Sequence, residues 1–235
     1  MSPIYVPGKV TLAKESVAAD PYYNNVSLLL HGDGSNGSTT ITDSGPSPKT
    51  VTAFGNAQII TAQSKFGGAS IAFDGSGDYI SAGTSNDFVF GTADFTIEFW
   101  AYPTNFANYR IIWDNRTSDS DVNGFVLGFS AVNIYLYTSS NFRISGSLPS
   151  LNQWSHVALT READKHKIFV NGLQAGSTYT ANNNYTRNSS QIGRYFLTNN
   201  DNYSGYIDDF RITKGVARYT SNFTPPTAPF PEVLG

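Results

Sequence analysis

The chain has 235 residues, of which 40% are hydrophobic and 14% charged, and its formal net charge is −3. This balance argues against a nucleic-acid-binding protein, and the absence of cysteine excludes disulfides and Cys-based zinc or redox sites. No run of about 18 apolar residues occurs, so we expect no membrane insertion. The many aromatic residues and turn formers are typical of an all-β protein.

The chain divides into three expected parts. Residues 1–24 are weakly patterned, do not resemble a secretory signal, and are expected to form an N-terminal arm or leader. Residues 25–224 carry regular strand signals and are the expected domain. Residues 225–235 form a Pro-rich tail, which cannot pair as a central strand. The expected strands are 26–30, 69–73, 78–81, 95–102, 109–113, 124–130, 134–138, 155–160, 167–170, 191–195 and 206–212.

Local patterns support this assignment. Residues 95–102 alternate between two faces with a period of two, as a strand does. Gly75-Ser-Gly77 between two apolar runs predicts a hairpin. Asn171-Gly172 predicts a type I′ turn, because both residue types tolerate positive φ. Short strands separated by turn signals predict an antiparallel sandwich of two β-sheets.

Five phrases occur in an order that resembles the laminin-G-like, concanavalin A-like jelly rolls. They are 70–80 (SIAFDGSGDYI), 94–102 (DFTIEFWAY), 153–160 (QWSHVALT), 167–172 (KIFVNG) and 205–212 (GYIDDFRI). The resemblance implies two antiparallel sheets stacked face to face. It does not imply one function, because lectins, adhesion modules, pentraxins, hydrolases and lyases share this fold.

Further phrases resemble bacteriophage versions of this domain. They are 28–34 (LLLHGDG), 38–44 (STTITDS) and 213–226 (TKGVARYTSNFTPP). This resemblance implies a virion protein that decorates the capsid or belongs to the tail or fibre. Its partners would be other virion proteins, bound through the N-terminal arm or the Pro-rich tail. The oligomeric state stays open, a homo-oligomer included.

The acidic residues argue against an enzyme. Glycosidases need two carboxylates across the scissile bond, and jelly-roll glycosidases of the laminarinase type place three acidic residues on one strand. No such strand occurs among the four glutamates, Glu15, Glu98, Glu162 and Glu232. We therefore expect no catalysis. A polysaccharide-degrading enzyme, built from aspartates that converge from distant loops, is the alternative.

The resemblance also suggests a structural calcium ion. In several jelly-roll relatives such an ion joins the N-terminal segment, an early strand and the closing strand. The matching positions are Asp33, the carbonyl of Gly68, and Asp208. Calcium prefers this mixture of carboxylate and carbonyl oxygens. Alternatively, Asp33 caps a turn and Asp208 binds loop backbone.

Two Asn-rich segments, 182–187 and 194–203, are candidates for binding host glycans. Sugars stack on aromatic rings, while Asn, Asp and Arg bind their hydroxyls. A stand-alone carbohydrate-binding module is therefore a second hypothesis, and an ordinary polar loop or a protein contact is the alternative. The expected ligand-binding residues are Tyr185, Arg187, Arg194, Tyr195 and Tyr203.

Overall fold

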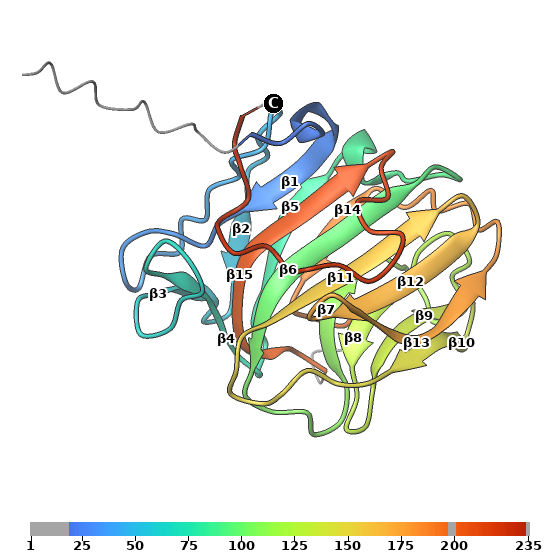
Figure 1. Cartoon of the computed structure of the whole chain (residues 1–235). Coiled ribbons are helices and arrows are strands. Elements are labelled where there is room, and N and C mark those ends of the chain that lie inside the picture. The colour runs from blue at the N-terminus through green and yellow to red at the C-terminus, as the bar shows by residue number, and fades with distance from the viewer. Residues whose placement is uncertain (1–18, 197–200, 234–235) are drawn as a thin grey trace, which may run out of the picture.

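Two antiparallel β-sheets packed face to face make up the structure (Figure 1). The computed structural model describes residues 19–196 and 201–233. The sequence-based prediction of an all-β sandwich of the concanavalin A-like type is confirmed. In the described part of the chain, no helix is long and apolar enough to cross a membrane.

The eight-stranded sheet has the order β13-β12-β11-β6-β15-β4-β3, and β1 also pairs with β15. Its strands are β13 (Leu173–Thr180), β12 (Lys165–Val170), β11 (Ser155–Glu162), β6 (Phe95–Pro103), β15 (Ser204–Lys214), β4 (Ser70–Asp74), β3 (Gln58–Ile60) and β1 (Val26–Leu30). The long strands β6 and β15 lie side by side at its centre.

The seven-stranded sheet has the order β10-β9-β8-β7-β14-β5-β2. Its strands are β10 (Asn141–Gly146), β9 (Ile134–Thr138), β8 (Val126–Phe129), β7 (Arg110–Asp114), β14 (Ser189–Ile192), β5 (Tyr79–Thr84) and β2 (Thr52–Phe54). Two short 3-10 helices, η1 (Tyr23–Asn25) and η2 (Asn86–Phe88), complete the elements of the described residues.

The core lies between the sheets and follows from the alternation along the strands. Phe95, Ile97 and Phe99 of β6 are fully buried and belong to the main core cluster. Across the core, the ring of Trp113 from β7 stacks on Phe210 from β15, with ring centroids 6.4 Å apart. Such contacts hold the two sheets together without disulfides.

The prediction of a hairpin at Gly75-Ser-Gly77 is wrong. β4 pairs with β3 and β15, whereas β5 pairs with β2 and β14, so the chain changes sheets at this turn. The side chain of Asp78 fixes the crossing, since it accepts hydrogen bonds from the backbone N–H of Asp74 at 2.7 Å and of Asn56 at 2.5 Å. A glycine-rich turn serves a hairpin or a crossing equally well.

The turn expected at Asn171-Gly172 is confirmed. Val170 and Leu173 are paired across it, and the two turn residues have φ values of 50° and 78°. Four strands were not expected from the sequence: β2, β3, β10 and β13. β2 and β3 have three residues each, and β10 and β13 are largely exposed, so their apolar patterns are weak.

The C-terminal segment packs on the outer face of the eight-stranded sheet. Figure 1 shows it in red, crossing the strands of this sheet. Phe230 from the Pro-rich tail is only 3% exposed and packs with Val26 and Leu29. The N–H of Asp20 donates to the carbonyl of Val233 at 2.8 Å. Residues 225–233 are therefore part of the folded body, as is Asp20 from the segment expected to form an arm.

Candidate functional site

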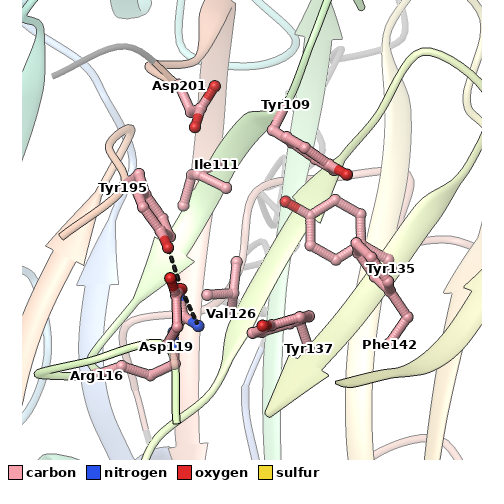
Figure 2. Close-up of a pocket in the computed structure, with 10 residues that line it drawn as sticks. All are labelled: Tyr109, Ile111, Arg116, Asp119, Val126, Tyr135, Tyr137, Phe142, Tyr195 and Asp201. Carbon is pink, nitrogen blue, oxygen red and sulfur yellow. Dashed lines mark hydrogen bonds and ion pairs between the residues drawn. The ribbon is translucent and has the colours of Figure 1, made fainter. Parts of the chain in front are cut away.

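A hollow of about 270 Å³ lies on the outer face of the seven-stranded sheet (Figure 2). Along β9, Ile134 and Leu136 point into the core, so the alternate residues Tyr135 and Tyr137 point outward. We call this feature the aromatic hollow. Its lining residues are Tyr109, Ile111, Arg116, Asp119, Val126, Tyr135, Tyr137, Phe142, Tyr195 and Asp201.

One wall of the aromatic hollow is a group of interlocking rings. Tyr135 meets Phe142 edge-on at 5.0 Å between ring centroids and Tyr109 edge-on at 5.8 Å. Tyr137 also contacts Phe142 edge-on, at 5.1 Å. Tyr109 is 42% exposed and Phe142 50% exposed. Large apolar surfaces are therefore held open to solvent.

The opposite wall is formed by Tyr195 and Asp119, as Figure 2 shows. The Tyr195 hydroxyl donates a hydrogen bond to the Asp119 carboxylate. Burial, together with this carboxylate, raises the pKa of Tyr195 to about 12. The guanidinium of Arg116 lies 5.2 Å from the ring centroid of Tyr195 and 5.0 Å from that of Tyr137. Both tyrosines thus rest on one buried cation.

Tyr135 brings a hydroxyl to the hollow. The residue is only 3% exposed, and Figure 2 shows its hydroxyl pointing into the hollow. Burial raises the pKa of Tyr135 well above its usual value, with Asp201 adding to the effect. The ring fits because position 128 is glycine: a Cβ there would lie 2.9 Å from the Tyr135 hydroxyl.

This arrangement suits a sugar. Apolar faces of a sugar ring can stack on the aromatic rings, while Asp119, Asp201 and the tyrosine hydroxyls can bind its hydroxyl groups. Small-molecule sites commonly have this form, with mostly apolar walls and a few placed polar groups.

The five expected ligand-binding residues do not form one site. Tyr195 lines the aromatic hollow. Arg187 is engaged with Asp121, with Nε 2.7 Å from the carboxylate. Arg194 lies over the ring of Tyr79, at 4.3 Å from its centroid.

Tyr185 and Tyr203 lie elsewhere. Both are 0% exposed and belong to the main core cluster. A surface ligand cannot stack on them, which corrects the expectation for these two residues. The Asn-rich composition around them suggested a loop surface, but in each segment the tyrosine turns inward.

Sequence reasoning missed most of the aromatic hollow. Residues 134–138 read Ile-Tyr-Leu-Tyr-Thr, and tyrosine at every second position was the available signal for an exposed aromatic face. Tyr109, Phe142 and Asp119 lie on separate segments, and only the fold brings them together.

Two of the three expected calcium ligands, Asp33 and Asp208, lie beside one loop at one corner. An ideal Cβ on Gly67 would lie 1.9 Å from an oxygen of Asp33, so this carboxylate lies directly against the backbone of Gly67. Asp208 accepts hydrogen bonds from the N–H of Lys65 at 2.6 Å and of Phe66 at 3.0 Å. Two carboxylates therefore flank one loop, and Asp208 binds the loop backbone, as the alternative to a calcium ligand predicted.

The electrostatics of this corner fit a cation. Burial raises the pKa of Asp208 to about 7, and the charges of Asp209 and Asp33 add to the shift. In the described part of the chain, no group of three or more His, Cys, Asp or Glu side chains is arranged to hold a metal. Calcium would therefore need the carbonyl of Gly68 and further backbone or water oxygens beside the two carboxylates.

Glu98, the glutamate on the long central strand β6, is not available for chemistry. It is fully buried beneath the C-terminal segment. Arg211 lies 2.7 Å from its carboxylate, and the Tyr219 hydroxyl donates to it at 2.7 Å. These positive and hydrogen-bonding neighbours hold the pKa of Glu98 far below its usual value despite its burial. Its role is to anchor the C-terminal segment.

Comparison with known proteins agrees with this architecture. Residues 74–218, over half of the chain, match the family model Laminin_G_3, described as the concanavalin A-like lectin/glucanases superfamily. The chain belongs to this superfamily. No curated protein matches the chain.

Several solved structures have a fold similar to that of this chain. One is domain 4 of AbnA, a GH43 extracellular arabinanase from Geobacillus stearothermophilus, solved in complex with arabinotriose. It is 17% identical to this chain, and the match has a TM-score of 0.61 and covers 82% of this chain and 94% of that one. The binding domain of botulinum neurotoxin serotype D is 17% identical, with a TM-score of 0.62 over 84% of this chain and 50% of that one. The binding domain of botulinum neurotoxin DC in complex with SialylT is 16% identical, with a TM-score of 0.60 over 83% and 49%. The chain thus spans about half the length of the toxin binding domains.

Proposed function

We propose that the chain is a non-catalytic, lectin-like domain that binds a glycan in the aromatic hollow. The observation that carries this proposal is the pair of exposed rings, Tyr109 and Phe142, held open beside two carboxylates. Relatives of the same fold, solved with arabinotriose and with SialylT, support a sugar as the ligand.

The test is a glycan-binding panel followed by calorimetry on any sugar that binds. Tyr109→Ala and Phe142→Ala each remove an exposed stacking surface. We expect each to weaken binding about tenfold, since an aromatic contact contributes about 0.5–1.5 kcal/mol beyond its buried area.

Leu173→Ala is the matched control. Leu173 is 63% exposed and lies on β13, in the other sheet, so its loss should leave binding unchanged. Equal binding by all three variants would place the ligand elsewhere. Release of shortened products from a bound polysaccharide would contradict the non-catalytic role and support the enzyme alternative.

We also propose that calcium binds at the corner formed by Asp33, Gly68 and Asp208, where it stabilises the fold. The test is thermal unfolding with calcium, with magnesium and with a chelator. Calcium should raise the melting temperature of the wild type more than magnesium does, because only calcium suits a flexible set of oxygen ligands. Asp208→Asn should remove this increase. An equal calcium response in that variant would refute the site.

The biological setting we propose is a phage virion, at the capsid surface or the tail. The support is the sequence resemblance of residues 28–34 and 213–226 to phage versions of the domain. Residues 1–18, the larger part of the expected arm for virion contacts, lie outside the described residues. Mass spectrometry of purified particles should detect the chain, and removing residues 1–18, which spares the buried Asp20, should prevent its incorporation. Absence from particles would refute this setting.

A further inference from the structure

We propose that the aromatic hollow prefers a sugar bearing a protonated amine over neutral and anionic sugars. This inference rests on the glycan binding proposed above and specifies the chemical class of the ligand. It follows from the charges, the rings and the Tyr135 hydroxyl of the hollow.

The charge left open in the hollow is negative. Two carboxylates, Asp119 and Asp201, stand at different ends of it, as Figure 2 shows. The Asp119 side chain is 57% exposed. Arg116 is the one cation among the lining residues, but its side chain is 2% exposed and binds Asp114 at 3.0 and 3.1 Å. Arg116 also lies 3.5 Å from Asp119. One buried cation therefore faces the carboxylates of Asp114 and Asp119, and Asp201 adds a third carboxylate, so the group keeps an excess of negative charge.

The rings also favour a cation. An ammonium group is attracted to the face of an aromatic ring, by about 0.5–1 kcal/mol at exposed sites and about 2 kcal/mol where water is excluded. Five rings line the hollow, from Tyr109, Tyr135, Tyr137, Phe142 and Tyr195. Arg116 already makes such contacts beneath Tyr137 and Tyr195. The ring surface that stays open to a ligand belongs mainly to Tyr109 and Phe142.

The hydrogen-bonding groups complement an amine. An ammonium group has three donors and no acceptor, so a matching site must offer acceptors. Asp119 and Asp201 offer carboxylate oxygens. The Tyr135 hydroxyl, which points into the hollow, offers lone pairs. A sugar carboxylate would instead meet two like charges.

The test compares three trisaccharides of equal length by calorimetry, at a pH where the amine is protonated. The probes are the glucosamine trimer, the N-acetylglucosamine trimer and the galacturonic acid trimer. We expect the glucosamine trimer to bind about tenfold more tightly than its N-acetylated form, and the acidic trimer most weakly. Raising the salt concentration should reduce this preference, because screening weakens exposed charge pairs.

Variants assign the preference to the carboxylates. Asp119→Asn and Asp201→Asn should each lower the affinity for the glucosamine trimer about two- to fivefold more than the affinity for the N-acetylated trimer, so that the preference for the amine shrinks. Asp164→Asn, in the turn between β11 and β12 of the other sheet, is the matched control and should have no effect.

The outcomes separate the two proposals. If the N-acetylated trimer binds as tightly as the amine, or the preference ignores salt and both Asp variants, the amine inference is overturned while glycan binding stands. If no sugar of the wider panel binds the folded protein, the proposed function fails and the amine inference with it.

Discussion

Arg116 is held by Asp114 through two hydrogen bonds, with Nε 3.0 Å from Oδ1 and Nη2 3.1 Å from Oδ2. Both residues are almost completely buried. The pair fixes the guanidinium beneath the rings of Tyr137 and Tyr195, so an ion pair in the interior sets the positions of two walls of the aromatic hollow.

Removing one partner of this pair should destabilise the protein strongly. Arg116→Met leaves the Asp114 carboxylate buried without its cation, which costs about 3–5 kcal/mol in comparable pairs. Unfolding in urea measures the loss. Lys49→Met is the control, because Lys49 pairs with the 44%-exposed side chain of Asp87 and such pairs contribute about 0–1 kcal/mol. Equal losses in the two variants would contradict a structural role for Arg116.

Glycine at position 128 should be required for the shape of the hollow. In Gly128→Ala, the new methyl group would lie 2.9 Å from the Tyr135 hydroxyl and 2.9 Å from the carbonyl oxygen of Arg110. We expect a loss of stability of about 1–3 kcal/mol, because crowding of this kind forces side chains and backbone to shift. The Tyr135 ring resonances should move in NMR spectra, and glycan affinity should fall. Unchanged Tyr135 resonances would contradict this packing.

Acid should destabilise the fold through His166. Burial is the main cause that lowers the pKa of this imidazole to about 4, and the charge of Arg161 lowers it further. An unfolded histidine has a pKa of about 6.5, so between pH 6.5 and 4 the unfolded state binds a proton that the folded state does not. Stability should therefore fall as the pH drops through this window, by about 3 kcal/mol at most from this group.

His166→Phe tests the assignment, because it removes the titrating group from a site surrounded by the rings of Phe95, Tyr179 and Tyr185. Urea unfolding at several pH values should show a flatter dependence between pH 6.5 and 4 than in the wild type. A dependence identical to that of the wild type would refute the role of His166.

The sandwich could be predicted from the sequence because many of its strands alternate between apolar and polar residues, as a strand with one face in the core requires. In β6 the alternation in sequence places Phe95, Ile97 and Phe99 in the core, although the strand is buried on both faces. Asn171-Gly172 favours a tight turn because both residues adopt positive φ. The crossing of the chain from one sheet to the other at Gly75–Gly77 could not be predicted from the sequence, because the residues of a turn do not determine which sheet the next strand joins.

The two candidate sites also differ in how much of each could be predicted from the sequence. The corner of Asp33, Gly68 and Asp208 follows from a resemblance in strand order, and the structure places Asp33 and Asp208 against the same loop. The aromatic hollow depends on where side chains from several separate segments point. Tyr185 and Tyr203 show the limit, since composition suggested exposure and packing buried both.

The most direct test of the account is an NMR titration of the isotope-labelled chain with a glycan that binds. We predict that shift changes concentrate on β7–β10 and on Asp119, Tyr195 and Asp201, around the aromatic hollow. Changes confined to the eight-stranded sheet or to the corner of Asp33 and Asp208 would contradict the central claim that this hollow is the binding site.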